Sequence, residues 1–172
     1  MEIRTVNPRP SNWFSYAINA LFLVMIVMGI RTWQQRDMSS GLAPPLQGST
    51  LAGLPYQLPS QPAQPVLVHF WATWCPICSA EQDSITAIAQ DYPNVITVAM
   101  KSGKSDEVIR HMKYQKIDFP VLNDPDGVIS GTWGVHALPA SFIIDREGQI
   151  RFVEVGYTTG IGLKLRLWLA GI

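Results

Sequence analysis

The chain has 172 residues, enough for one ordinary domain and too few for two full catalytic domains. Its 13 basic and 13 acidic residues cancel, which argues against a basic face and against a nucleic-acid partner. Only two cysteines occur, Cys75 and Cys78. They exclude a multi-disulfide scaffold and a four-cysteine zinc or iron–sulfur site, and we expect neither a bound metal nor a separate cofactor.

The chain contains fewer charged residues than usual, and a long uncharged segment near the N-terminus accounts for much of the difference. Charged residues make up 15% of the chain, against about 25% in ordinary soluble domains, and residues 10–30 contain none. The apolar part, 13–30, corresponds to about 27 Å of helix, close to the roughly 30 Å hydrocarbon core of a bilayer. We predict a transmembrane anchor at 13–33, preceded by a short cytoplasmic segment at 1–12.

Two alternatives to the anchor stay open at this point, a buried core helix and a cleaved signal peptide. The apolar region of a signal peptide is usually about 7 to 15 residues long and is followed at once by small residues. Here Arg31 follows instead. Positive charges balance on the two sides of the segment, so charge alone does not fix orientation, although the free amino terminus favours a cytoplasmic N-terminus.

Residues 34–44 are predicted to form a linker, and 45–172 a folded domain. The stretch 39–65 contains six prolines and no charged residue, a composition typical of a tether. Two short apolar pieces inside it predict a small hairpin at the edge of the domain, formed by 46–51 and 56–58 with Gly53 in the turn.

The next part of the chain alternates between strand and helix patterns. Val66–Trp71 is mostly apolar, β-branched and aromatic, as a buried central strand would be. A helix is predicted from Pro76 to about Gln90, and a second strand at 94–99. The order strand, helix, strand implies a right-handed crossover and parallel pairing. Ser105 is predicted to cap a further helix.

The C-terminal part predicts a hairpin and one ambiguous element. Strands at 140–144 and 149–155, joined by a tight turn with glycine, give the sheet an antiparallel edge. In the tail, 161–169, leucines alternate as in a strand, whereas Thr158 or Thr159 as an N-cap would allow a helix. The pattern alone leaves both structures open. The whole chain predicts an α/β fold.

The chemistry is concentrated in the Cys-x-x-Cys motif. Because the motif ends a strand and begins a helix, both sulfurs lie at a helix N-terminus, which favours thiolate over thiol. We predict that Cys75 is the exposed nucleophile and that Cys78, one turn further, is more buried and resolves a mixed disulfide. Pro76 fits the first helical turn, where its missing N–H costs little.

Other uses of the cysteine pair fit less well. A zinc site would need further ligands, and the three histidines are far apart in the sequence. Covalent haem attachment needs a histidine after the second cysteine, where Ser79 stands. A purely structural disulfide would close a loop too small to restrict the unfolded chain much. Redox exchange is therefore favoured.

Several further motifs accompany the cysteines: Trp74–Cys78, Glu81, Phe119–Gly127, Trp133–Val135, Leu138–Asp145 and Gly148. Together they resemble membrane-anchored thioredoxin-like proteins of the TlpA, ResA and DsbE (CcmG) type, over about residues 44–171. With the Pro-Ile dipeptide between the cysteines and the N-terminal anchor, the chain is most similar to the suppressor of copper sensitivity (ScsD) branch.

The resemblance implies a thioredoxin fold, with a central mixed sheet flanked by helices, in the periplasm behind an anchor in the bacterial inner membrane. It implies a thiol-disulfide oxidoreductase that reduces protein disulfides with Cys75 and Cys78, is recharged by a DsbD-like transmembrane reductant, and is linked to copper tolerance. A disulfide oxidase or isomerase, a non-enzymatic Cu(I)-thiolate binder and a structural docking domain are the alternatives.

The resemblance also assigns roles to residues around the cysteines. It implies a cis peptide bond between Leu138 and Pro139, which would leave the backbone of Leu138 open to pair with a substrate strand. Trp74, Pro76, Leu138 and Pro139 would form the substrate surface.

Glu81 would assist proton transfer at the buried thiol, or else be an exposed helix carboxylate. Relatives usually carry proline where this chain has Asp83, so either an undistorted helix or a second acidic group near the site is expected. His69 is predicted to be a hydrogen-bonded core histidine. His136 is a loop residue or tunes the site.

Overall fold

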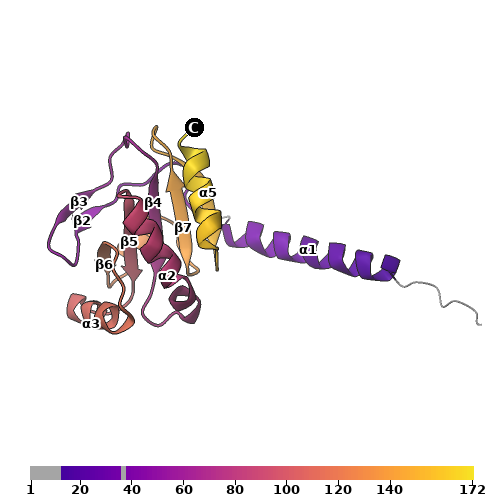
Figure 1. Cartoon of the computed structure of the whole chain (residues 1–172), viewed down its shortest axis with the longest axis horizontal. Helices are drawn as coiled ribbons and strands as arrows, with labels where there is room; N and C mark the ends of the chain where they lie inside the picture. The colour runs from indigo at the N-terminus through magenta and orange to yellow at the C-terminus, as the bar shows by residue number, and fades with distance from the viewer. Residues whose placement is uncertain (1–12, 36–37) are drawn as a thin grey trace, which may run out of the picture. The chain divides into compact units, whose positions relative to one another are not determined.

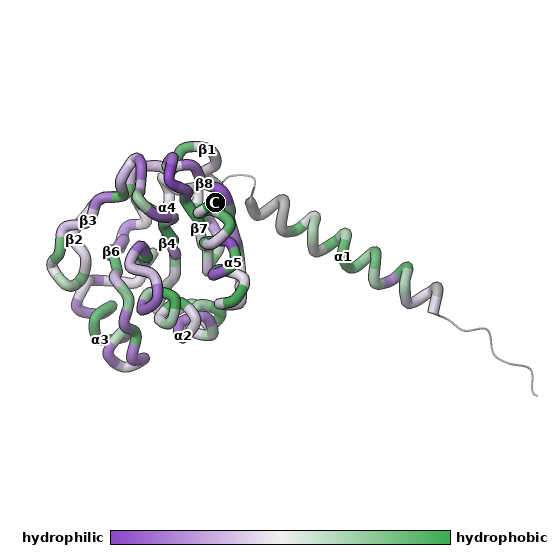
Figure 2. Tube along the Cα trace, turned by 45° about the horizontal axis from the view of Figure 1, so that its top comes forward, coloured by the Kyte–Doolittle hydropathy of each residue, from purple (hydrophilic) through white to green (hydrophobic). Residues whose placement is uncertain are grey.

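An N-terminal helix and a folded domain make up the protein, whose computed structural model describes residues 13–35 and 38–172. The chain divides into two compact units after Trp33. The first unit contains all but the last two residues of helix α1 (Trp13–Gln35), which includes the predicted anchor. Figure 2 shows hydrophobic residues recurring along α1. Their large apolar side chains, such as Leu21 and Phe22, are exposed.

Across residues 13–35 and 38–172, no helix combines the length and the apolar character that crossing a membrane requires. The transmembrane anchor predicted at 13–33 is therefore not confirmed, although the segment is helical as expected. The cytoplasmic segment predicted at 1–12 lies outside the described residues.

A six-stranded mixed sheet forms the centre of the domain, with its strands in the order β1-β8-β7-β4-β5-β6. The neighbouring strands β7, β4, β5 and β6 can be followed in Figure 1. Strand β5 runs parallel to β4 and to β6, whereas β7, β8 and β1 join by antiparallel pairing. The predicted parallel pair and the predicted C-terminal hairpin are thus confirmed. The strands are β1 (Gly41–Leu42), β4 (Val66–Trp71), β5 (Val95–Met100), β6 (Val121–Asp124), β7 (Ala140–Ile144) and β8 (Gln149–Val155).

Strand β4 is buried along its whole length because both faces of the sheet are covered. Leu67 and Trp71 face one hydrophobic cluster, while Val68 and Phe70 face the other, as strand alternation requires. Side chains of α2, α3 and α5 contribute to the first cluster, and α4 packs against the second. Helices α2 and α5 lie side by side (Figure 1). The helices are α2 (Pro76–Asp91), α3 (Ser105–Gln115), α4 (Val128–Thr132) and α5 (Gly160–Ala170).

The folded domain begins earlier than predicted. Met38 is only 7% exposed and belongs to the core cluster that contains Phe70. Strand β1 pairs with β8, with Gly41 opposite Ile150. The linker predicted at 34–44 therefore includes core and sheet residues, because a short edge strand gains its hydrogen bonds from a distant partner that local composition does not reveal.

The predicted hairpin is present beside the main sheet. It consists of β2 (Gln47–Ser49) and β3 (Pro55–Gln57). Gly53 has φ +79° in the connecting turn, a left-handed conformation that glycine adopts without a steric penalty. The backbone N–H of Leu51 also donates to the carbonyl of Val121 at 2.8 Å, which ties the hairpin to β6, the edge strand of the sheet.

The predicted cap of α3 is wrong by one residue. Lys104, not Ser105, is the N-cap, and Ser105 is the first helical residue. The carboxylate of Glu107 accepts the backbone N–H of Lys104 at 2.7 Å. Because this side chain satisfies the first unpaired donor, the helix needs no serine hydroxyl at its start.

The C-terminal tail is a helix, which settles the ambiguity in its sequence. Thr159 is the N-cap of α5, and its hydroxyl accepts the backbone N–H of Gly162 at 3.2 Å. Leu163 and Leu167, one turn apart, are buried against the core, whereas Leu165 is exposed. The alternation of leucines therefore reflects two faces of one helix.

Like β1, the short elements β6 and α4 were not predicted; they lie at the two ends of the turn cluster at 123–127. The carboxylate of Asp124 accepts the backbone N–H groups of Ile129 and Ser130, at 3.1 and 2.8 Å, and the Ser130 hydroxyl at 2.7 Å. Elements of four and five residues are too short to show a hydrophobic period.

Candidate active site

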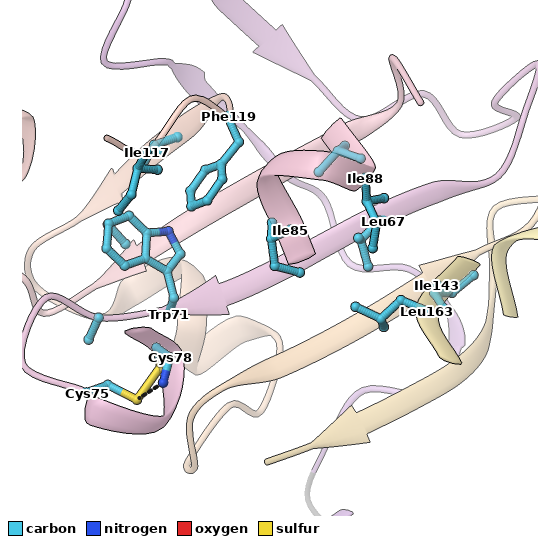
Figure 3. Packing of buried hydrophobic residues seen from close by; sticks show 14 of the residues in the cluster. Leu67, Trp71, Cys75, Cys78, Ile85, Ile88, Ile117, Phe119, Ile143 and Leu163 are labelled. Atoms are coloured by element: carbon cyan, nitrogen blue, oxygen red, sulfur yellow. Dashed lines mark hydrogen bonds between the residues drawn. A yellow bond between two sulfur atoms is a disulfide. The ribbon is translucent and has the colours of Figure 1, made fainter. Parts of the chain in front are cut away.

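Cys75 lies between the end of β4 and the start of α2, and Cys78 lies in the first turn of α2 (Figure 3). Cys75 is the N-cap in an extended conformation, and Pro76 takes the first helical position, as expected. A disulfide joins Cys75 to Cys78, and the Sγ atom of Cys75 accepts the backbone N–H of Cys78 at 3.1 Å. After reduction, the same N–H and the helix N-terminus would stabilise a thiolate on Cys75.

Both cysteines are nearly buried in the disulfide form, with exposures of 5% for Cys75 and 1% for Cys78. The prediction of an exposed Cys75 is therefore wrong for this form, whereas Cys78 is the less exposed of the two, as predicted. The reason is that the N-cap side chain folds over the first turn and packs in the same hydrophobic cluster as Trp71 (Figure 3). The adjacent Trp74 and Pro76 are exposed.

Glu81 lies one turn after Cys78 on α2 and is 1% exposed. One carboxylate oxygen accepts the backbone N–H of Thr158, and the other has no hydrogen-bond partner among the described residues. Burial raises the pKa of Glu81 to about 7, and the bond from Thr158 partly opposes this shift. The alternative of an exposed helix carboxylate is wrong. The group can exchange a proton near neutral pH.

Asp83 does not form a second buried acidic group. It is exposed, and α2 runs without interruption from Pro76 to Asp91. Of the two consequences expected from the missing proline, the structure shows the undistorted helix. The buried carboxylate near the cysteines is therefore that of Glu81.

The residues predicted to contact substrate differ in their exposure. The Trp74 side chain is 61% exposed, and its indole N–H donates to the carbonyl of Lys101 at 3.0 Å. Leu138 is half-buried against the cluster that contains both cysteines, and Pro139 is buried. The peptide bond between Leu138 and Pro139 is cis, as expected. Trp74 and Leu138 are thus available to contact a partner, while their role in binding stays a prediction.

His69 and His136 have different surroundings, one in the core and the other in an exposed loop. His69 on β4 is 2% exposed, and its Nδ1 atom is hydrogen-bonded to the hydroxyl of Ser141 on β7 at 2.9 Å. Burial lowers the pKa of His69 to about 3, so the ring is neutral near pH 7. The predicted core histidine is confirmed. His136 is exposed in the loop before Leu138.

Thr158 is the residue near the site that the sequence did not identify. The sequence suggests for it only the role of a helix cap, a position that Thr159 occupies. It contacts Glu81 through its backbone N–H. Every residue except proline has this group, so the contact cannot be predicted from the residue type. Within the described residues, no group of three or more Cys, His, Asp or Glu side chains gathers to hold a metal ion.

Comparison with known proteins identifies relatives of the whole domain. A family model described as the AhpC/TSA family matches residues 41–153. The chain is 31% identical over 107 residues to a thioredoxin-like protein of Haemophilus influenzae, a match that spans 62% of this chain and 64%, less than two thirds, of that protein. It is 29% identical over 153 residues to the thiol:disulfide interchange protein DsbE of Tatumella citrea, covering 79% and 82% of the two chains.

Solved structures share the fold. The crystal structure of StoA from Bacillus subtilis gives a TM-score of 0.63 at 25% identity, covering 71% of this chain and 95% of that one. A secreted disulfide oxidoreductase of Mycobacterium tuberculosis, homologous to Escherichia coli DsbE, gives 0.61 at 26% identity, with coverage of 72% and 95%.

The comparisons confirm the resemblance to DsbE-type thiol-disulfide interchange proteins, while the finer assignment to the ScsD branch stays a prediction. The mixed sheet flanked by helices is the architecture that this resemblance implied. Because the family model matches well over half of the 172 residues, the chain belongs to the AhpC/TSA family, with a thioredoxin-like fold.

Proposed function

We propose that this protein is a thiol-disulfide oxidoreductase that reduces protein disulfides with Cys75 and Cys78. The observation that carries the proposal is the disulfide at the start of α2, where the backbone N–H of Cys78 points at the Sγ atom of Cys75. Relatives named as thiol-disulfide interchange proteins support it.

The first step uses the reduced pair. The Cys75 thiolate attacks one sulfur of the substrate disulfide, so that a bond forms between Cys75 and the substrate, the substrate S–S bond breaks, and its other sulfur leaves as a thiolate. Exposed Trp74 and Pro76, together with Leu138 and the adjoining Pro139, would supply the surface against which the substrate chain lies.

The second step closes the pair. Glu81, with a pKa of about 7, accepts the proton of the Cys78 thiol, and the resulting thiolate attacks Cys75. The Cys75–Cys78 bond forms, the bond between Cys75 and substrate breaks, and the second substrate sulfur leaves as a thiolate. Two electrons have then passed from the dithiol to the substrate, which becomes fully reduced.

The reductase direction is inferred from the resemblance and from the Pro76-Ile77 dipeptide, which lacks the histidine that strongly oxidising relatives often carry. A DsbD-like transmembrane reductant would return two electrons to the disulfide after each cycle. An oxidase or isomerase would use the same cysteines with a different redox potential. The link to copper tolerance and the alternative of Cu(I) binding stay predictions.

We place this activity in the bacterial periplasm, held at the inner membrane by α1. The support is the absence of charge in residues 10–30 and the exposure of apolar side chains such as Leu21 and Leu23 on α1. In alkaline carbonate extraction, the full chain should remain with the membranes. Release into the supernatant would contradict this placement.

The test of the function is a redox titration of the full chain together with an insulin-reduction assay. We expect insulin reduction that Cys75→Ser abolishes, and a reduction potential well below the roughly −120 mV of DsbA. A potential near that of DsbA would contradict the reductase direction. Absence of exchange with any protein disulfide would contradict the oxidoreductase itself.

A further inference from the structure

The loop that precedes Cys75 is fastened to a second loop, which follows β5. The backbone N–H of Thr73 donates to the hydroxyl of Ser102 at 3.0 Å. The indole N–H of Trp74 donates to the carbonyl of Lys101, also at 3.0 Å. Both residues just before Cys75 therefore donate a hydrogen bond to the pair Lys101 and Ser102, which is distant in the sequence.

Ser102 is well placed to accept its bond. It is 7% exposed, and its hydroxyl donates to the carbonyl of Met100 at 3.1 Å. A serine hydroxyl carries one proton, so this donation fixes its rotation and leaves a lone pair for the N–H of Thr73. Thr73 lies outside the helices and strands, and removing the hydroxyl would leave its N–H without this partner.

Buried contacts hold the second loop in place. Lys101 has φ +45°, a left-handed conformation that is uncommon for a residue other than glycine. Its N–H donates to the carbonyl of Asp124 at 2.8 Å. Asp124 is 3% exposed, and its carboxylate is tied to Ser130 by two hydrogen bonds. The loop that offers both acceptors is thus hydrogen-bonded to Asp124 at the end of β6.

We propose that Ser102 is a positioning residue for Cys75, acting through the backbone of Thr73. The inference rests on the proposed function and deepens it, because it names what holds the nucleophile. Cys75 must remain the N-cap of α2 for its Sγ atom to stay beside the N–H of Cys78. A looser peptide at Thr73 would let the sulfur move away from this donor.

The effect of loosening the loop depends on which redox form of the cysteine pair the N–H of Cys78 stabilises. A thiolate on Cys75 gains most from the N–H of Cys78, so loosening the loop destabilises the reduced form. Less thiolate is then present at pH 7, and the nucleophile reacts more slowly. The reduction potential becomes more negative, because the disulfide form is affected less.

The experiment measures alkylation of Cys75 by iodoacetamide in the reduced full chain, read by mass spectrometry. In Ser102→Ala, we expect the rate at pH 7 to fall by roughly threefold to tenfold, the effect of losing about one hydrogen bond, and to approach the wild-type rate at alkaline pH. Ser102→Thr keeps the hydroxyl and should restore the rate. Ser105→Ala, an exposed serine beyond the same loop, should leave the rate unchanged.

Two results would overturn the proposal: wild-type alkylation at pH 7 in Ser102→Ala, or equal losses in Ser102→Ala and Ser102→Thr. If Ser102→Ala does not fold, amide exchange of Thr73 in the wild type decides, because the proposal requires protection there and rapid exchange contradicts it. A wild-type chain that reduces no protein disulfide would refute the proposed function, while the alkylation rates would still test Ser102.

Discussion

The backbone N–H of Thr158 donates a hydrogen bond to the buried carboxylate of Glu81, from a position 77 residues further along the chain. The bond connects the loop before α5 to the helix that begins at the cysteine pair. It favours the charged carboxylate, but burial disfavours that form more strongly, so the pKa of Glu81 rises to about 7. Helix α2, which buries Glu81, and the loop before α5, which offers the N–H of Thr158, together set the pKa of this carboxyl group.

Glu81 makes the stability of the domain depend on pH. Its pKa rises from 4.5 in the unfolded chain to about 7 in the folded domain, so the folded state binds the proton more tightly. The associated stability is fully present below about pH 4.5 and is lost as the pH rises through about 7, by up to about 3 kcal/mol. Glu81→Gln should remove this decline, as measured by urea unfolding from pH 4.5 to 8.

Asp83→Asn is the matched control, because Asp83 is an exposed carboxylate two residues further along the same helix. It should keep the wild-type dependence of unfolding free energy on pH. If Glu81→Gln keeps that dependence as well, the buried carboxylate is not its source.

Replacing Cys78 should trap the substrate. In Cys78→Ser, the first step can still proceed, but no thiol remains to attack the mixed disulfide on Cys75. We expect covalent complexes of the full chain that dithiothreitol releases, detected on non-reducing gels and identified by mass spectrometry. The double variant Cys75→Ser, Cys78→Ser should form none. Complexes that persist in the double variant would show that they do not arise at this pair.

The hydrogen bond between His69 and Ser141 should contribute measurably to stability. Ser141→Ala leaves the buried Nδ1 atom of His69 without its partner, a change that costs about 1 to 3 kcal/mol. Urea unfolding at pH 7 measures the loss. Ser49→Ala, on the exposed β2 strand, should change stability by at most about 0.5 kcal/mol. Similar values for the two variants would contradict a role for the buried bond.

His69 should also destabilise the domain in acid. Burial lowers its pKa from 6.5 in the unfolded chain to about 3 in the folded domain, so the unfolded state binds the proton more tightly. This contribution to stability is present above about pH 6.5 and is lost as the pH falls towards 3. In a Glu81→Gln background, which removes the opposing effect, the unfolding free energy should decrease from pH 6.5 to 4. A flat profile would show that His69 is not buried in its neutral form.

The cap of α5 provides a test of the C-terminal helix. Thr159→Ala removes the hydroxyl that accepts the N–H of Gly162 and should lower stability by about 1 kcal/mol, while Thr159→Ser should retain most of it. Thermal unfolding followed by circular dichroism measures both variants. Ile161→Ala is the neighbouring control, since this side chain in the first turn of the same helix is 83% exposed. A loss in Ile161→Ala as great as in Thr159→Ala would contradict the assignment of the cap.

The sequence alone determined the features that depend on neighbouring residues. The spacing of Cys75 and Cys78 after an apolar strand predicted their place at a helix N-terminus, because strand patterns, proline and helix caps act over a few residues. Parallel pairing of the central strands followed from the order of elements. The family motifs added the cis bond before Pro139.

Only the tertiary structure decided the features that depend on distant contacts. Burial of Glu81, its bond from Thr158 and the bond from Thr73 to Ser102 join residues that are far apart in the chain. The two hydrogen bonds are donated by backbone N–H groups, which nearly all residue types have, so the sequence does not reveal them. The C-terminal tail was ambiguous for a related reason. Its sequence is compatible with a strand or a helix, and packing of Leu163 against the core favours the helix.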